Sequence, residues 1–314
     1  MNELGSLLRT IFAPATFNQT LRSATPVALA AIGGSMTEHA GIMNIGMDGM
    51  ILMGAFFGVY GSFLLASGWL GLLLAIGVGV LVGLLFGVLV VKLRSDEFII
   101  GCALNTFAAG LTSFLSRAVF GSAGAKNLPS LPRVNLPGIR DIPFVGEVLR
   151  DLPVFFYITL LLVLLLWLFV YKTPYGFWLR AAGEKPETLR TAGISPERMK
   201  WLASLLCGIF CGIAGAYLSL CNLQGTFAEN MSNSRGYIAF ACVIFAAASP
   251  AKAYLAALMF GFFDAIGLRL QSFVSSDLTA IIPYAITIIM MIYVVARTQR
   301  RRRHAHGKLI SKGV

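Results

Sequence analysis

Long apolar stretches constrain this chain more than any other feature of its sequence. Most of them hold about 20 residues, the length that an α-helix needs to cross the hydrocarbon core of a bilayer. The predicted spans are residues 47–65, 69–91, 98–120, 154–170, 201–220, 237–248, 251–270 and 278–296. Only 12% of the 314 residues are charged, whereas a soluble domain usually has about 25%. We therefore predict an all-α, polytopic transmembrane helical bundle of about eight to ten spans.

Two places in this pattern suggest broken helices. Residues 20–46 form either one continuous helix with Glu38 near its end, or a segment that breaks at Gly33 and Gly34 and re-enters the membrane. We predict a discontinuous N-terminal segment here. An internal similarity supports this prediction, because the polar sequences NIGMDG at 44–49 and SNSRG at 232–236 each precede an apolar run. Paired breaks in two halves of a transporter indicate a binding site where the halves meet.

A polar segment at 171–200 interrupts the apolar pattern and carries six basic and three acidic residues. Pro186 suits the first turn of a helix, where its missing N–H is not needed. Gly193 suits the left-handed residue that ends a helix, and Ser195 with Pro196 has the pattern of an N-cap and first residue. We predict a short helix docked between two spans, with an ordinary charged loop as the alternative.

The basic residues predict the orientation of the chain. By the positive-inside rule, the segment 171–200 and the tail 297–314 are cytoplasmic, and four predicted spans separate them. Lys92 and Arg94 mark another cytoplasmic turn. The whole chain, 1–314, is treated as one transmembrane domain with its membrane core at 17–296. The net charge of +11 therefore reflects membrane orientation and does not indicate a nucleic-acid partner.

Polar residues inside or next to the predicted spans are the candidates for a translocation pathway. A charge near the bilayer centre costs about 2.5–3.5 kcal/mol on insertion scales, so each one needs a reason. The candidates are Glu38, Asn44, Asp48, Asn105, Asn222 and Asp264. Four of them have an alternative role: Glu38 could close a helix break, Asp48 could cap a helix, Asp264 could make a buried structural hydrogen bond, and Asn222 could belong to a solvated loop.

Small residues recur every four positions in three of the spans. The repeats are Gly54 and Gly58; Gly79, Gly83 and Gly87; and Gly208 and Gly212. Small residues at this spacing let helix backbones approach closely in lipid. The pattern predicts close helix packing, either inside one bundle or at a subunit interface.

Catalytic and cofactor-binding motifs are missing from the sequence. There is no G-x-x-x-x-G-K-[ST] phosphate loop, no H-E-x-x-H and no G-x-S-x-G, and the five cysteines have no metal-ligand spacing. We therefore expect no catalytic residue, no metal site and no cofactor bound by this chain. An enzyme is not the expected function.

Two stretches carry a resemblance to a known family. TPVALAAIGG at 25–34 followed by EHAGIMNIGMDG at 38–49 resembles the opening signature of the branched-chain amino acid and simple-sugar permease family of ABC importers. The similarity is closest to bacterial nucleoside permeases that work with a BMP-type lipoprotein. In the polar segment, Gly176, LRAAGE at 179–184, Pro186 and AGI at 192–194 resemble the coupling loop of that family. The resemblance covers roughly residues 17–296.

The resemblance implies one half of an importer pore in the bacterial plasma membrane. The implied partners are a cytoplasmic ATP-binding subunit that uses ATP and Mg²⁺, a second permease subunit, identical or homologous, and an external substrate-binding lipoprotein. The implied substrate is a nucleoside or a related simple sugar. The ATPase-coupling residues would be Arg180, Ala182, Gly183, Glu184, Pro186, Ala192 and Gly193. Thr188 and Leu189 depart from the small residues frequent in that loop.

A proton- or sodium-coupled secondary transporter is the rival hypothesis. Its coupling residues would be Glu38, His39 and Asp264. This hypothesis leaves the marked helix at 186–193 unexplained, whereas an ABC permease accounts both for that helix and for the missing ATP-binding motif. The sequence alone does not select a particular substrate or say whether the second permease is identical.

Overall fold

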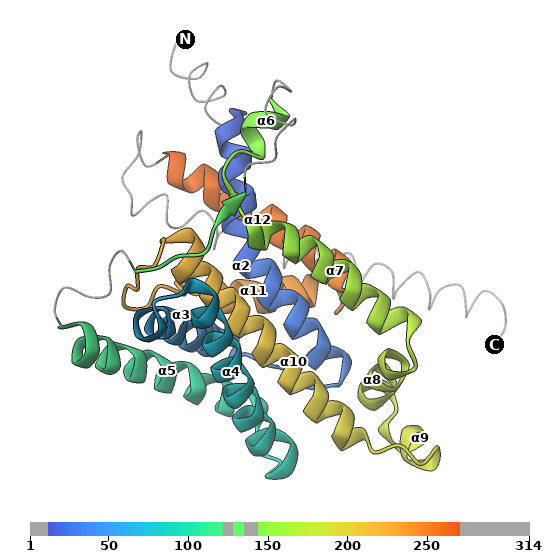
Figure 1. The fold of residues 1–314 in the computed structure, drawn as a ribbon. Helices are drawn as coiled ribbons and strands as arrows, with labels where there is room; N and C mark the ends of the chain where they lie inside the picture. The colour runs from blue at the N-terminus through green and yellow to red at the C-terminus, as the bar shows by residue number, and fades with distance from the viewer. Residues whose placement is uncertain (1–11, 122–127, 135–143, 271–314) are drawn as a thin grey trace.

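The chain folds into a bundle of long, tilted helices in the computed structural model, which describes residues 12–121, 128–134 and 144–270 (Figure 1). The larger helices are α2 (Pro14–His39), α3 (Met47–Leu65), α4 (Gly68–Gly87), α5 (Glu97–Phe120), α7 (Val154–Lys172), α10 (Pro196–Ala216), α11 (Arg235–Phe245) and α12 (Pro250–Leu270). The π-helical turns η1 (Val88–Lys92) and η3 (Tyr217–Asn222) extend α4 and α10. The short elements are α6 (Val145–Val148), α8 (Pro174–Glu184), α9 (Pro186–Thr191), β1 (Arg133–Val134) and β2 (Leu152–Pro153), the two strands being antiparallel.

Six helices of the described chain are long and apolar enough to cross a membrane: α3, α4 with η1, α5, α7, α10 with η3, and α12. Their bounds match the predicted spans to within a few residues, and the all-α fold class is confirmed. The predicted span 237–248 corresponds to the short helix α11. The predicted span 278–296 and the basic tail lie outside the described residues.

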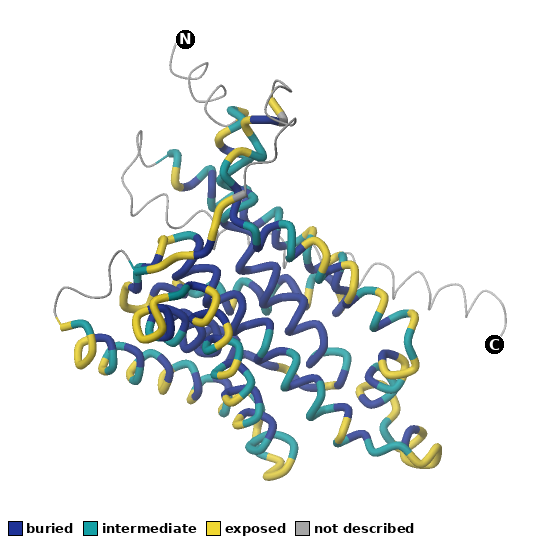
Figure 2. Tube along the Cα trace, viewed as in Figure 1, coloured by how far each residue is buried: buried dark blue, intermediate teal, exposed yellow. Residues whose placement is uncertain are grey.

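The interior of the bundle consists of α2, α3 and α10 (Figure 2). Helix α2 is continuous through Gly33 and Gly34, so the predicted break and re-entry at these glycines is wrong. The chain leaves helical geometry only at 40–46, beyond Glu38. Its hydroxyl side chains bond within the helix; for example, Ser35 donates to the carbonyl of Ala31 at 2.9 Å. Such bonds satisfy hydroxyl groups that would otherwise be buried without a partner.

Glycine contacts explain how α3, α4 and α10 pack so closely. A Cβ atom on Gly79 of α4 would overlap the carbonyl oxygen of Gly208 on α10. A Cβ atom on Gly54 of α3 would lie 2.8 Å from the Cα atom of Gly212. The glycine repeats predicted close packing either inside one bundle or at a subunit interface. The contacts of Gly79 and Gly54 are of the first kind, because they form within one chain.

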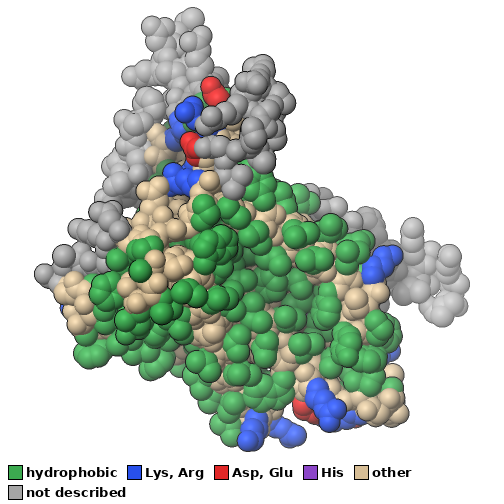
Figure 3. Space-filling model, in the orientation of Figure 1, with side chains coloured by type: hydrophobic (Ala, Val, Ile, Leu, Met, Phe, Trp, Pro, Cys, Tyr) green, Lys and Arg blue, Asp and Glu red, His purple; other side chains and the backbone are tan. Residues whose placement is uncertain are grey.

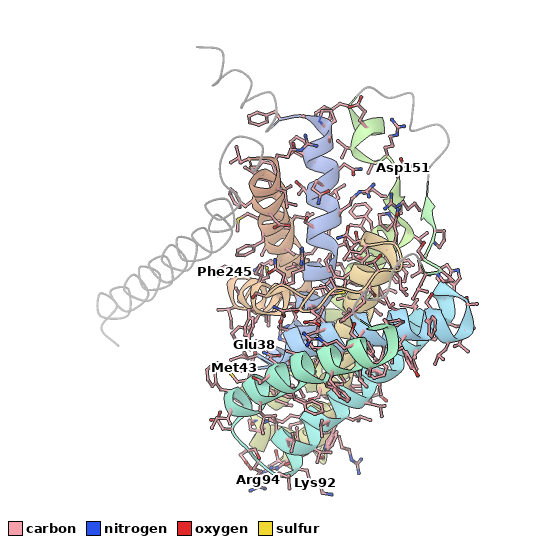
Figure 4. All side chains as sticks on the ribbon, turned by 90° about the vertical axis from the view of Figure 1, so that its left-hand side faces the viewer. Glu38, Met43, Lys92, Arg94, Asp151 and Phe245 are labelled. Atoms are coloured by element: carbon pink, nitrogen blue, oxygen red, sulfur yellow. The ribbon has the colours of Figure 1, made fainter. Side chains whose placement is uncertain are left out.

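Charged side chains gather at two opposite ends of the molecule, with a broad apolar surface between them (Figure 3). One end carries α8, α9 and the turn with Lys92 and Arg94, and the other carries α6 and Asp151 (Figure 4). We call these the α9 end and the α6 end. This separation is the pattern expected of a protein that crosses a membrane, and the predicted cytoplasmic segment 171–200 lies at the α9 end.

Candidate functional site

Helix α8 begins the connection between α7 and α10 at the α9 end. The hydroxyl of Thr173 accepts a hydrogen bond from the backbone N–H of Gly176 at 3.2 Å, and Pro174 occupies the first turn. The buried face of α8 is formed by Gly176, Leu179 and Ala182. The sequence analysis missed this helix, although Thr173 and Pro174 repeat the cap pattern recognised at Ser195 and Pro196.

Helix α9 follows directly and was predicted. Pro186 lies in its first turn, and Gly193 after its end has a φ angle of +78°. The hydroxyl of Ser195 accepts from the N–H of Arg198, so the predicted cap of α10 is present. Helix α9 is shorter than the segment between Pro186 and Gly193, because it ends at Thr191.

The candidate coupling residues differ in their exposure. Four of them are exposed: Gly183, Glu184, Ala192 and Gly193. Ala182 is buried, while Pro186 and Arg180 are intermediate. The Arg180 guanidinium lies 5.1 Å from the centre of the Tyr171 ring. The surface available to a partner is therefore the segment from Gly183 onward, whereas Arg180 and Ala182 hold α8 in place.

Gly183 is also an internal contact. A Cβ atom on Gly41, whose φ angle is +71°, would lie 2.9 Å from the Cα atom of Gly183. A Cβ atom on Gly183 would in turn lie 2.7 Å from the backbone nitrogen of Gly41. The end of α8 thus rests on the non-helical segment 40–46. The end of α8 and the segment 40–46 are therefore in direct backbone contact.

A hollow of about 620 Å³ lies beside α9. Its walls include the α4–α5 turn with Lys92 and Arg94, and the charged side chains of Glu187, Arg190 and Glu197. Arg190 pairs with Glu197 and with Glu187, and the two carboxylates raise the pKa of Arg190 above its ordinary value. The α9 end therefore offers a hollowed, charged surface.

A second group of polar residues lies halfway along the bundle, where two helices begin. One carboxylate oxygen of Asp48, in the first turn of α3, accepts from the backbone N–H of Gly236 in α11 at 2.9 Å. The other accepts from the hydroxyl of Ser232 at 3.0 Å. Asp48 is 8% exposed and Ser232 is fully buried. Because helix N-termini carry partial positive charge, a single carboxylate here stabilises the N-termini of both α3 and α11.

Asn44 and Asn105 hold the backbone around Asp48. The side-chain oxygen of Asn44 accepts from the N–H of Gly46 at 3.0 Å. The Asn105 oxygen accepts from the N–H of Gly49 at 2.7 Å, and its nitrogen donates to the carbonyl of Ile45 at 3.0 Å. These amides satisfy backbone groups that the break at 40–46 leaves outside any helix. Asn44, Asp48 and Asn105 are thus brought together with Ser232 and Gly236, and we call these five residues the central cluster.

The segment that enters α11 has an unusual backbone. Asn230, Asn233 and Ser234 have φ angles of +54°, +44° and +61°. Left-handed conformations cost on the order of 1–3 kcal/mol for residues with a side chain, and they cluster at switching and binding sites. The Asp48 contacts to Ser232 and Gly236 hold this strained segment in the bundle.

The other three pathway candidates lie apart from the central cluster. Glu38 is half-buried at the end of α2, and near it Glu97 accepts from the N–H of Met43 at 2.9 Å (Figure 4). Asn222 is half-buried at the end of η3. Asp264 is half-buried on α12, which packs against α2, α11 and α7.

The sequence analysis did not name Ser232, Gly236 or Tyr237 as site residues. The internal similarity between 44–49 and 232–236 was the signal for Ser232 and Gly236, since the structure places these two segments in direct contact through Asp48. No pattern singled out Tyr237, whose hydroxyl accepts from the Asn105 amide at 2.8 Å. One break precedes α3 and the other precedes α11.

Residues 16–293 match the profile of the family described as the permease component of the branched-chain amino acid transport system. A guanosine ABC transporter permease protein of Bacillus subtilis is 32% identical over 308 residues, which covers 94% of this chain and 95% of that protein. A nucleoside ABC transporter permease protein of Lactococcus lactis is 31% identical, with 85% and 88% covered. A putative glucose ABC transporter permease protein of Haloferax volcanii is also 31% identical, with 93% and 94% covered. No solved structure matches the chain.

Proposed function

Because this chain belongs to the permease family of branched-chain amino acid-type ABC transport systems, we propose that it forms half of the membrane pore of an importer for nucleosides. It is a multi-pass integral membrane protein, and we place it in the bacterial plasma membrane. The observation that carries the proposal is its similarity to a guanosine permease over nearly the full length of both chains. A simple sugar is the second candidate substrate, because a putative glucose permease is almost as similar.

The importer needs partners, because this chain has no phosphate-binding loop of its own. We propose that a separate ATP-binding subunit, which holds ATP and Mg²⁺, docks on α9 and the exposed end of α8. A second permease subunit completes the pore, and an external lipoprotein delivers the substrate at the α6 end. The exposed residues of α9 and the hollow beside it support the first of these assignments.

The contacts suggest a route from the ATPase to the pore. Movement of α8 displaces the segment 40–46 through the contact of Gly183 with Gly41. Seven residues further along the chain, Asp48 holds the beginning of α11. The ATPase can therefore shift the equilibrium between two arrangements of the central cluster, and it does so only as far as it binds one arrangement more tightly.

Thr188 tests docking better than Gly183 does, because a side chain at Gly183 would disturb the internal contact with Gly41. Thr188 is exposed on α9, and its side chain makes no hydrogen bond within the described residues. We expect Thr188→Arg to abolish guanosine uptake while leaving the amount of protein in the membrane unchanged, because a bulky cation would separate α9 from the ATPase. Thr188→Ala is the matched control and should transport normally.

The assay is uptake of radiolabelled guanosine and glucose by cells that lack the gene and carry each variant on a plasmid. Loss of guanosine uptake alone on deletion, with recovery by the wild type, supports the nucleoside proposal. Loss of glucose uptake alone would assign the protein to sugars. Full activity of Thr188→Arg would show that α9 is not the docking helix.

A further inference from the structure

Polar side chains are exposed halfway along the bundle, beside the central cluster. Asn105 and Thr106 lie on α5, about two turns from its beginning at Glu97, and Tyr237 lies in the first turn of α11. Thr106 is exposed, and 43% of Tyr237 is exposed. The hydrogen bond of Asn105 to Tyr237 joins the two helices at this surface.

Helix α5 has two different exposed sides. Thr106, Ser113 and Arg117 recur at a spacing that places them on one side. Phe107 and Phe114 lie about 100° further around the helix axis, at the other edge of the exposed face, and are 56% and 69% exposed. Lipid suits the exposed ring of Phe107, whereas the guanidinium group of Arg117 would carry a large energetic cost in hydrocarbon. The hydroxyl of Thr106 is satisfied within the helix, because it donates to the carbonyl of Cys102 at 3.1 Å. The side of α5 that carries Arg117 therefore faces water or protein in the assembled transporter.

The polar side of α5 leads from an open hollow to the central cluster. At the α6 end of α5, a hollow of about 610 Å³ is lined by Ser113, Phe114, Arg117, Ala118 and Glu229. Arg117 pairs with Glu229 at 2.8 Å, and this contact lowers the pKa of the Glu229 carboxyl. From this hollow, Ser113 and Thr106 continue along α5 to the Asn105–Tyr237 pair. Along α5, Ser113 and Thr106 thus lie between the hollow and the Asn105–Tyr237 pair.

Tyr237 offers two kinds of contact at the inner end of this surface. Tyr237 is 43% exposed, and an accessible aromatic ring can stack on a planar base. Its hydroxyl oxygen accepts from Asn105, and no residue of the described chain takes the hydroxyl hydrogen. That hydrogen is free to be donated to a nitrogen or oxygen of a ligand. Both N–H groups of the Asn105 amide are already donated, to Ile45 and to Tyr237, and its oxygen accepts from Gly49, so its role is to orient the tyrosine.

We propose that the translocation pathway follows the polar side of α5, that Tyr237 contacts the nucleobase of the passing substrate, and that Asn105 is its positioning residue. This proposal rests on the proposed function, since it identifies the substrate contact within the same pore. The ligand class is an uncharged, planar molecule with hydrogen-bond acceptors. Asn105 accepts a hydrogen bond from Gly49 and donates one to Tyr237, so the position of Tyr237 depends on the central cluster. The substrate contact and the arrangement of α3 and α11 therefore change together.

The first test measures which side of α5 meets water. Thr106→Cys and Phe107→Cys are compared in the assembled transporter, with Cys102 replaced by alanine because it is only half-buried. A charged, membrane-impermeant thiol reagent should label Thr106→Cys several times faster than Phe107→Cys, and guanosine should slow that labelling. Equal labelling of the two cysteines, or faster labelling of Phe107→Cys, would overturn the pathway.

The second test measures the substrate contact through KM for guanosine. Tyr237→Phe keeps the ring and loses the hydroxyl, so KM should rise roughly fivefold, while Tyr237→Ala should raise KM by at least roughly tenfold. Phe107→Ala is the control and should keep the wild-type KM. If the wild type imports guanosine and every Tyr237 variant keeps its KM, or loses only protein abundance, the contact is refuted while the importer stands. If the wild type imports no nucleoside, the proposed function itself fails.

Discussion

Asp48→Ala is expected to abolish transport. The substitution removes both oxygen atoms that accept from Gly236 and Ser232. Each buried donor left without a partner costs about 1–3 kcal/mol, and the strained segment before α11 then loses its attachment. Since each 1.4 kcal/mol changes an equilibrium about tenfold, uptake of substrate should fall by more than about tenfold. Initial uptake rates, normalised to the amount of protein in the membrane, provide the measurement.

Two variants sharpen the Asp48 prediction. Asp48→Asn keeps one side-chain oxygen, so it should retain part of the activity. Asp264→Asn is the matched control, because Asp264 is a half-buried acid on α12, away from the central cluster. The account predicts near-normal uptake for Asp264→Asn. Normal uptake by Asp48→Ala, or loss of uptake in Asp264→Asn but not in Asp48→Ala, would contradict the role given to the central cluster.

Gly79→Leu is expected to prevent correct folding of the bundle. Gly79 meets the backbone of Gly208 so closely that even a Cβ atom overlaps the carbonyl oxygen. Overpacking in a core usually costs about 1–3 kcal/mol, and here the obstacle is backbone, which cannot rotate away. The amount of folded protein extracted from membranes should fall sharply, and any protein that remains should unfold at a lower temperature.

Gly77 provides the control two residues away on the same helix. It is exposed, and a Cβ atom there would meet nothing within 4 Å. Gly77→Leu adds the same side chain on the outer face of α4 and should leave yield and unfolding temperature unchanged. Similar behaviour of the two variants would show that the close approach of α4 and α10 does not stabilise the fold.

The membrane spans were predictable because the length and the apolar character of a membrane helix both follow from a run of consecutive residues. Helix α2 is the instructive exception. Its alanine, glycine and hydroxyl residues make it less apolar than its neighbours, so Gly33 and Gly34 suggested a possible break. Helix α2 is instead continuous and buried by α10, α11 and α12. Gly33 allows α10 to approach closely, since a Cβ atom at this position would lie 2.7 Å from the Cβ of Phe210.

The central cluster was only partly predictable for a different reason. Asn44, Asp48 and Asn105 are conspicuous as polar residues in apolar stretches. Their partners Ser232 and Gly236 lie 184 and 188 residues from Asp48 along the chain, and one of the two bonds is donated by backbone, which no side-chain pattern reveals. Nothing in the sequence distinguishes Tyr237 from other aromatic residues. Its role follows from the hydrogen bond with Asn105, which joins α11 to α5.

The source of energy tests the central claim most directly. The measurement is accumulation of radiolabelled guanosine in proteoliposomes that contain this chain with its permease, ATPase and lipoprotein partners, with or without ATP on the ATPase side. The account predicts accumulation that requires ATP, is blocked by vanadate and survives an uncoupler. Accumulation without ATP that follows a proton or sodium gradient and collapses with an uncoupler would contradict it, and would favour a secondary transporter.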